Sequence, residues 1–307
     1  GGDLEPMLRK IHTLIELLFP EPKIDQRNFT WQQSLGLLAG LTLIFYVVGS
    51  ILQPGQYIGF DWVNIFSTGR VLPFYPPWVS AVRWLNWPLL LALSCAGIGL
   101  AVARRATNPF NLFAVFFSLP VLWTLFLGQL EGLVVLGLAG LPLLTPLALL
   151  KPQVSVFAFA AKKSTLLILV LWLAVSILIW GWWPQKMFAV NSFYAEGRYA
   201  QDISIGWIGA ILALPMAWFS RGDMDMLMLS GAVMTPHLIP YNMLPFAPAA
   251  ARLRPWQAIL ACLFSWLPFS ANWLGNGGWW LGWIYVFWLW SCLAVKRYKT
   301  DRPGRVT

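Results

Sequence analysis

The stretch "WQQSLGLLAGLTLIFYVVGSIL", residues 31–52, contains no charged side chain. An α-helix needs about 20 apolar residues to cross the ~30 Å hydrocarbon layer of a bilayer, and this run has that length. The whole chain of 307 residues is 58% hydrophobic and only 11% charged. Soluble proteins carry about 25% charged residues, so this chain lacks the polar surface needed to cover a globule in water. The sequence therefore indicates an integral membrane protein.

Further apolar runs follow the first and predict more membrane spans. Their residues are 84–103, 110–127, 130–150, 164–182, 204–220, 224–237, 239–251, 256–271 and 277–295. Several runs are short or contain proline, for example Pro142 and Pro245, so kinked or re-entrant helices are expected among them. The predicted fold class is all-α, a polytopic transmembrane helix bundle of about 10 spans, within a range of about 8 to 11.

The distribution of basic residues predicts the orientation of the chain. With the N-terminus in the cytoplasm, most of the 21 lysines and arginines fall on cytoplasmic segments, and Lys151 is one of them. The basic residues on outer segments are then Arg70, Arg83, Lys186 and Arg198. An excess of Lys and Arg on the cytoplasmic side sets orientation in membrane proteins with short loops. Both termini are therefore expected in the cytoplasm, with the protein in a plasma (inner) membrane.

Three parts of the chain are expected. Residues 1–30 combine an amphipathic helix over 3–19, lying on the cytoplasmic membrane surface, with a linker. Residues 31–295 form a single transmembrane domain with an extracytoplasmic loop at 53–83, and residues 296–307 form a basic cytoplasmic tail. The net charge of +9 is attributed to cytoplasmic retention, so membrane lipid is the expected partner and nucleic acid is not. Protein partners stay unspecified.

The loop "GFDWVNIFSTGRVLPFYPPW", residues 59–78, places Asp61 and Arg70 in an aromatic segment near the outer boundary. The hydrophobic residues after Asp61 favour a helix lying flat at the interface, and the prolines favour an extended turn after it. Asp61 is either the N-cap of that helix or a catalytic carboxylate. The other acids on outer segments are Glu131, Glu196 and Asp202. No second acid is expected beside Asp61.

Two polar interruptions flank the run 130–150. "LFLGQLEGLVV", residues 125–135, brings Gln129 and Glu131 to an outer turn, as either turn formers or site residues. "LLKPQVSVF", residues 149–157, brings Lys151 to the inner boundary, where its side chain is expected to extend toward lipid headgroups.

A proline-rich segment and one further loop complete the candidate site. "AVMTPHLIPYNMLPFAPAAA", residues 232–251, predicts broken half-helices that bring His237, Tyr241 and Asn242 near the outer side. His237 is either a buried structural residue or part of a site. "NSFYAEGRYAQD", residues 191–202, adds Arg198 on an outer loop. With only two histidines in the chain, a multi-histidine metal centre is excluded and no metal site is predicted.

Taken in order, the outer Asp61, the "YPP" element, "GQ", "LLKPQ" and "TPHLIPYNMLPFAPAAA" resemble the polytopic GT-C glycosyltransferases, especially the family-87 group. The resemblance covers roughly residues 31–251. It implies a polyprenyl-phosphate sugar as donor substrate, with Asp61 acting on the hydroxyl of an acceptor. It also implies donor-phosphate or substrate binding by Arg70, Arg198, His237, Gln129, Glu131, Tyr241 and Asn242. Dependence on a divalent metal ion stays open, and no cofactor is implied.

Three functions follow from these observations. The first is a membrane glycosyltransferase that moves a sugar from a polyprenyl-phosphate donor to an acceptor hydroxyl on the extracytoplasmic face. The second is a non-catalytic GT-C-derived subunit or lipid-binding scaffold, in which Asp61 would bond only to the backbone of its own loop. A transporter ranks third, because no ionisable residue is predicted in the middle of a span.

Overall fold

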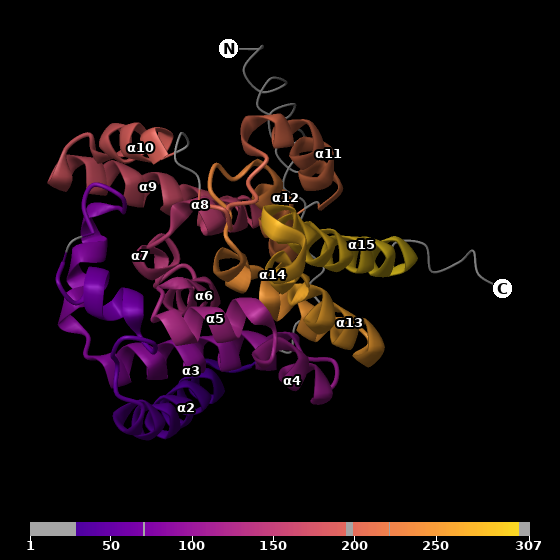
Figure 1. Cartoon of the computed structure of the whole chain (residues 1–307), viewed down its shortest axis with the longest axis horizontal. Helices are drawn as coiled ribbons and strands as arrows, with labels where there is room; N and C mark the ends of the chain where they lie inside the picture. Colours follow the sequence, from indigo (N-terminus) through magenta and orange to yellow (C-terminus); the bar gives the residue numbers. More distant parts are fainter. Residues whose placement is uncertain (1–28, 70, 195–198, 221, 301–307) are drawn as a thin grey trace, which may run out of the picture.

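The computed structural model describes residues 29–69, 71–194, 199–220 and 222–300, which form helices and no β-strand. The longer α-helices are α2 (Trp31–Ile51), α3 (Trp87–Arg105), α9 (Lys163–Trp180), α10 (Trp183–Tyr194), α11 (Ala210–Ser220), α12 (Met224–Met234), α13 (Pro255–Ser265) and α15 (Gly282–Thr300). The shorter ones are α4 (Phe110–Phe116), α5 (Leu119–Leu127), α6 (Glu131–Ala139), α7 (Thr145–Ala148), α8 (Pro152–Ser155) and α14 (Ala271–Leu274). Figure 1 shows α2 beside α3 and α9 beside α10. The all-α prediction is confirmed.

The tighter and wider helices lie between these. Loop 53–83 contains the π-helix η1 (Trp62–Phe66) and leads into the 3₁₀ helix η2 (Pro77–Trp84). The other 3₁₀ helices are η3 (Val156–Ala161), η5 (Gly206–Gly209), η6 (Pro240–Arg252), η7 (Leu267–Ser270) and η8 (Gly275–Leu281). Residues 3–19, predicted as an interface helix, lie outside the described residues. α15 continues to Thr300, so its helix extends into the predicted tail.

Four apolar helical segments of the described chain are long enough to span a membrane: α2, α3, α9 and Pro255–Tyr298. A fifth is added if α4 and α5, which are bent by 51° at their junction, count as one broken span. Only 11% of the apolar window of α2 and 17% of that of α9 are buried inside the protein, whereas 72% of that of α3 is buried. Apolar helices so exposed are unstable in water, and their environment is lipid.

The predicted crossing helix at 130–150 is wrong. A continuous helix of that length would hold its ends about 30 Å apart, but the Lys151 ammonium lies 2.5 Å from the Glu131 carboxylate. The segment begins as α6, turns near Pro142 and runs back toward the start of α6 through α7. α6 and α7 pack closely, since a Cβ added at Gly137 of α6 would lie 2.0 Å from the backbone nitrogen of Ala148 in α7. Gly140 and Pro142 end α6. The hairpin then returns the chain, so that Lys151 lies beside Glu131, the first residue of α6.

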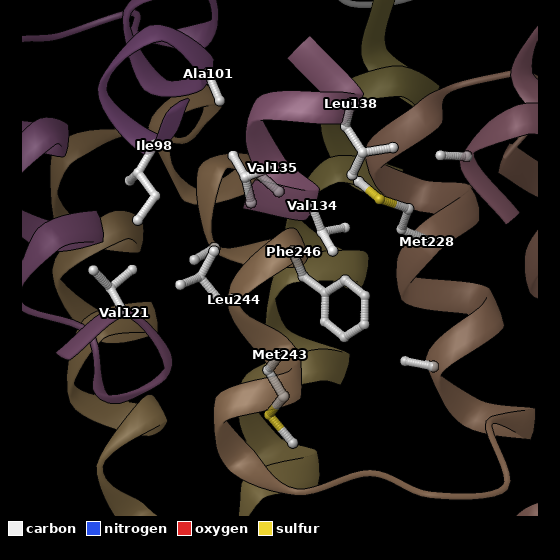
Figure 2. Packing of buried hydrophobic residues seen from close by; sticks show 14 of the residues in the cluster. Ile98, Ala101, Val121, Val134, Val135, Leu138, Met228, Met243, Leu244 and Phe246 are labelled. Atoms are coloured by element: carbon white, nitrogen blue, oxygen red, sulfur yellow. The ribbon is translucent and has the colours of Figure 1, made fainter. Parts of the chain in front are cut away.

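The proline-rich segment forms the centre of the core. The prediction of a broken helix here is confirmed, since α12 ends at Met234 and η6 follows as a 3₁₀ helix with Pro245 and Pro248 inside it. η6 packs against α3, α5, α6 and α12. Figure 2 shows its Phe246 among buried side chains of α6 and α12 such as Val134 and Met228. Small alanines at 247 and 249–251 are fully or almost fully buried, which lets these helices approach closely.

A buried ion cluster ties together the ends of α3, α12 and η6. This arginine cluster consists of Arg105, Asp223, Asp225 and Arg252. Arg105 and Arg252 both bind the Asp225 carboxylate, with nitrogen–oxygen distances of 2.9 Å and 3.0 Å. Arg252 also binds Asp223 at 2.7 Å. Two guanidinium groups and two carboxylates balance in charge, which is the condition under which buried ions are tolerated.

Candidate functional site

Loop 53–83 is held against the turn between α5 and α6 at the opposite end of α3. The amide of Gly59 donates a hydrogen bond of 2.7 Å to the carbonyl of Phe126. Gly128 ends α5 with φ +72°, and a Cβ there would lie 2.8 Å from Trp62 and from Trp87, the first residue of α3. Only glycine combines this backbone angle with such close packing. The contact places Asp61, at the start of η1, over Gln129.

Asp61 belongs to a continuous chain of polar side chains. Its Oδ2 accepts a hydrogen bond of 2.5 Å from Nε2 of Gln129, whose Oε1 accepts one of 2.7 Å from Nζ of Lys151. The same Nζ donates to Oε1 of Glu131 at 2.5 Å, and Nδ2 of Asn242 donates to that oxygen at 2.6 Å. We call these five residues the polar chain. They come from η1, the α5–α6 turn, α6, the residue before α8, and η6.

The polar chain runs from the protein interior to one accessible carboxylate. Gln129, Glu131, Lys151 and Asn242 are all at most 4% exposed, whereas Asp61 is partly exposed. Burial raises the pKa of the Asp61 carboxyl, while the hydrogen bond from Gln129 and the charge of Lys151 act in the opposite direction without cancelling it. Asp61 is therefore a stronger base than an ordinary aspartate, held in a fixed direction.

Two expectations about Asp61 are corrected. Asp61 occupies the N-cap position of η1, as one interpretation expected, but its side chain makes no capping hydrogen bond, so the carboxylate does not cap the helix. A second acid does lie near Asp61, because Glu131 is connected to it through Lys151 and Gln129. The two acids are far apart in the sequence, and only the contact of loop 53–83 with the α5–α6 turn brings them together.

Aromatic rings enclose the centre of the polar chain. The Lys151 ammonium lies 4.9 Å from the ring centroid of Tyr241 and 5.7 Å from that of Tyr75, distances typical of cation–π contacts. Tyr241 in turn meets the ring of Trp123 edge to face at 6.3 Å. An ammonium enclosed by a carboxylate, an amide and two aromatic faces is shielded from water, which strengthens its electrostatic interactions.

A second acid–base pair lies at the beginning of the proline-rich segment. Oδ2 of Asp202 accepts a hydrogen bond of 2.7 Å from Nδ1 of His237, and its Oδ1 accepts the backbone amides of Ser204 and Leu238, each at 3.0 Å. Burial acts to raise the pKa of Asp202, but His237 and these amides outweigh it, so the pKa lies below its ordinary value. The His237 side chain is 35% exposed. Its Nδ1 is bound to Asp202, which directs Nε2 away from that carboxylate.

The structure joins part of the predicted site and leaves part of it apart. Asp61 bonds to Gln129 and Glu131 bonds to Asn242, Lys151 joins these two pairs, and the ring of Tyr241 packs on Lys151. His237 is bound to Asp202 instead of to the polar chain. The predicted residues Arg70 and Arg198 lie outside the described residues.

Two residues of the site were missed by the sequence interpretation, Lys151 and Tyr75. Lys151 was expected at the opposite boundary of the membrane from Gln129 and Glu131, and this expectation is wrong because it bonds to both. The available signal was the position of "GQLE" and "LLKPQ" at the two ends of one apolar run broken by Pro142 and Pro146. Polar residues at both ends of a re-entrant hairpin meet on the same side.

No three of the described His, Cys, Asp and Glu side chains gather closely enough to hold a metal ion. Neither a protein-family model, nor a curated protein, nor a solved structure matches the chain. The function is therefore inferred from the site itself.

Proposed function

We propose that this protein is a membrane glycosyltransferase of the GT-C type, which moves a sugar from a polyprenyl-phosphate donor to an acceptor hydroxyl. One observation carries the proposal. The short sequence elements on which the resemblance rests, around Asp61, Gln129, Lys151 and Asn242, form one hydrogen-bonded chain. These elements are scattered over much of the chain, and their convergence on a single accessible acid is what an active site requires.

In the proposed reaction, Asp61 takes the proton of the acceptor hydroxyl. The O–H bond breaks, the acceptor oxygen forms a bond to the anomeric carbon of the sugar, and the bond from that carbon to the phosphate oxygen breaks. The electron pair of that bond leaves on the lipid phosphate. Asp61 is suited to act as the base because burial raises its pKa and because Gln129 occupies only its Oδ2. In the same step the doubly protonated ring of His237 gives its Nδ1–H to Asp202 and its Nε2–H to an oxygen of the leaving phosphate.

We further propose that the site faces the extracytoplasmic side, in a bundle with more crossings than the four or five long spans. The polar chain lies near the Trp87 end of α3, and the arginine cluster lies at its Arg105 end. A helix of this length separates the two by about 28 Å. Arg104 adds a further basic residue to the second end. The basic end is the cytoplasmic one under the positive-inside rule, which puts Asp61 on the opposite face.

The experiment is a transfer assay in proteoliposomes, with a panel of radiolabelled polyprenyl-phosphate sugars as donors and the membrane glycolipid fraction as acceptor. The Asp61→Asn variant is expected to lose transfer by a factor of roughly 100 or more while folding normally. Asp301→Asn makes the same chemical change in the C-terminal tail and serves as the matched control. Full activity in Asp61→Asn would remove Asp61 from the mechanism. Absence of transfer by the wild-type protein with every donor would refute the proposed function.

A specific observation favours a second candidate, an ion-coupled or proton-coupled transporter. Glu131 and Lys151 form an ion pair buried within the helical body, although no such residues were expected there. Buried ionisable pairs in membrane proteins mark ion and proton pathways. Substrate-driven proton flux that is lost in Glu131→Gln would identify transport. The scaffold alternative predicts that Asp61 bonds only within its own loop, whereas Asp61 bonds to Gln129.

A further inference from the structure

Lys151 occupies a costly position for which membrane anchoring offers no explanation. Its side chain is 2% exposed, and its ammonium is held by Glu131 and Gln129 and flanked by the rings of Tyr75 and Tyr241. Burying an ammonium is unfavourable unless carboxylate and hydrogen-bond partners compensate for the lost hydration. Among the described residues, this buried set is linked to an accessible group by the hydrogen bond from the amide of Gln129 to Asp61.

The chemistry of the ammonium decides how that amide points. A protonated lysine has three N–H donors and no acceptor, so Gln129 must turn its carbonyl oxygen toward Lys151. The amide nitrogen then faces Asp61 and donates to Oδ2. With the amide reversed, a carbonyl oxygen would face the carboxylate and repel it. Oδ2 is occupied by this bond and no described side chain bonds to Oδ1, so Oδ1 is the oxygen that would meet a substrate hydroxyl.

We propose that Lys151 is a positioning residue for Asp61, which acts through the amide of Gln129 and is itself held in place by Glu131 and Asn242. Lys151 orients Gln129, Gln129 occupies one oxygen of Asp61, and the other oxygen is directed to the substrate. This inference rests on the proposed function for its kinetic consequences. The influence of Lys151 on Asp61 can be measured without any substrate.

The charged and titratable groups that act on Asp61 come from several elements. The Lys151 charge favours its ionised form, and the Glu131 charge disfavours it. The phenols of Tyr75 and Tyr241 also interact electrostatically with Asp61. Loss of the Lys151 charge therefore moves the titration midpoint of Asp61 to higher pH. When Glu131 is neutralised as well, the midpoint moves less, because the two charges act on Asp61 in opposite directions.

Three variants test the assignment. Lys151→Met removes the ammonium and keeps the length of the side chain. The double variant Lys151→Met with Glu131→Gln removes the buried pair together, so that no unpaired charge prevents folding. Lys163→Met, at an exposed position at the start of α9, is the matched control. We expect kcat to fall roughly 100-fold in the first two variants, with KM for the lipid donor unchanged, and no effect in the control.

A variant of the connecting amide tests the route. Gln129→Leu should lower kcat as much as Lys151→Met does, and combining the two should cause no further loss, because both remove the same connection. Additive losses would show that Lys151 acts on the reaction by another route and would overturn the proposal. Wild-type kcat and an unchanged pH profile in the double variant of Lys151 and Glu131 would overturn it as well.

A substrate-free measurement separates this inference from the proposed function. The carboxyl stretching band of Asp61 can be assigned by its loss in Asp61→Asn, and its titration followed by infrared spectroscopy. In Lys151→Met the titration should move to higher pH, and in Lys163→Met it should not. If the titration midpoint of this band moves in Lys151→Met although the wild-type protein transfers no sugar, the positioning role stands and the proposed function fails. If the wild-type protein transfers sugar and the titration midpoint does not move in Lys151→Met, the positioning role fails.

Discussion

Asp225→Asn is expected to be among the most destabilising single substitutions in this protein. The Asp225 carboxylate accepts hydrogen bonds from Nε of Arg105 at 3.0 Å and 3.1 Å and from Nη1 of Arg252 at 3.0 Å. The substitution keeps the size of the side chain and removes its charge. Arg252 retains Asp223, at 2.7 Å and 2.8 Å. Among the described groups, Arg105 then keeps only neutral acceptors, the carbonyl of Ala101 at 3.1 Å and the amide oxygen at position 225, and becomes a buried cation without a counter-charge.

The expected cost follows from that one unpaired ion. Removing one partner of a buried ion pair lowers the free energy of unfolding by about 3–5 kcal/mol. Asp223→Asn is the matched comparison, because Asp223 is 14% exposed and Arg252 keeps Asp225 as its partner. Its cost should be about 1.5–3 kcal/mol, the value of a hydrogen bond to a charged group. Combining Asp225→Asn with Arg105→Met removes both ions and should recover most of the lost stability.

The assay is reversible unfolding in mixed detergent micelles, followed through the fluorescence of the many tryptophans. Asp225→Asn should be the least stable protein of the set, below both Asp223→Asn and the double variant of Asp225 and Arg105, and the wild type should be the most stable. Equal losses for Asp223→Asn and Asp225→Asn would refute the reasoning, since they would mean that Arg105 does not depend on Asp225. A double variant less stable than Asp225→Asn would refute it too.

Three further predictions concern pH and packing. Because burial raises the pKa of Asp61 above 3.8, the acid limb of the pH profile of sugar transfer should lie above pH 3.8, and a midpoint at or below that value would contradict the role of burial. The lowered pKa of Asp202 means that its contribution to stability is complete above pH 3.8 and is lost as the pH falls further. The midpoint of thermal unfolding should therefore drop at acidic pH by less in Asp202→Asn than in the wild type. Gly137→Val should destabilise the protein by about 3 kcal/mol or prevent folding, since its Cβ would overlap the backbone of Ala148. Gly36→Val, where an added Cβ meets nothing within 4 Å, is the control and should leave the unfolding midpoint nearly unchanged.

The residues of the site were recognisable in the sequence as polar interruptions of apolar runs. Asp61, Gln129 and Glu131 stand out because a charged or amide side chain is rare in such surroundings. Lys151 stood out equally, but its side of the membrane was assigned by counting spans, and the count treated 130–150 as a crossing. Counting assumes that each apolar run of sufficient length crosses the bilayer, which fails for a hairpin.

Composition and apolar runs alone were sufficient to establish a helical protein suited to lipid, because a bilayer leaves the backbone few other ways to satisfy its hydrogen bonds. They also located α2, α3 and α9. The folding of α6 and α7 into a hairpin, and with it the bond between Lys151 and Glu131, was decided by tertiary structure. The apolarity of a segment measures its affinity for lipid or for a protein core, and it does not show whether the chain crosses the membrane or turns back. A hydrogen bond, in contrast, depends on which side chains the packed helices bring within about 3 Å of each other.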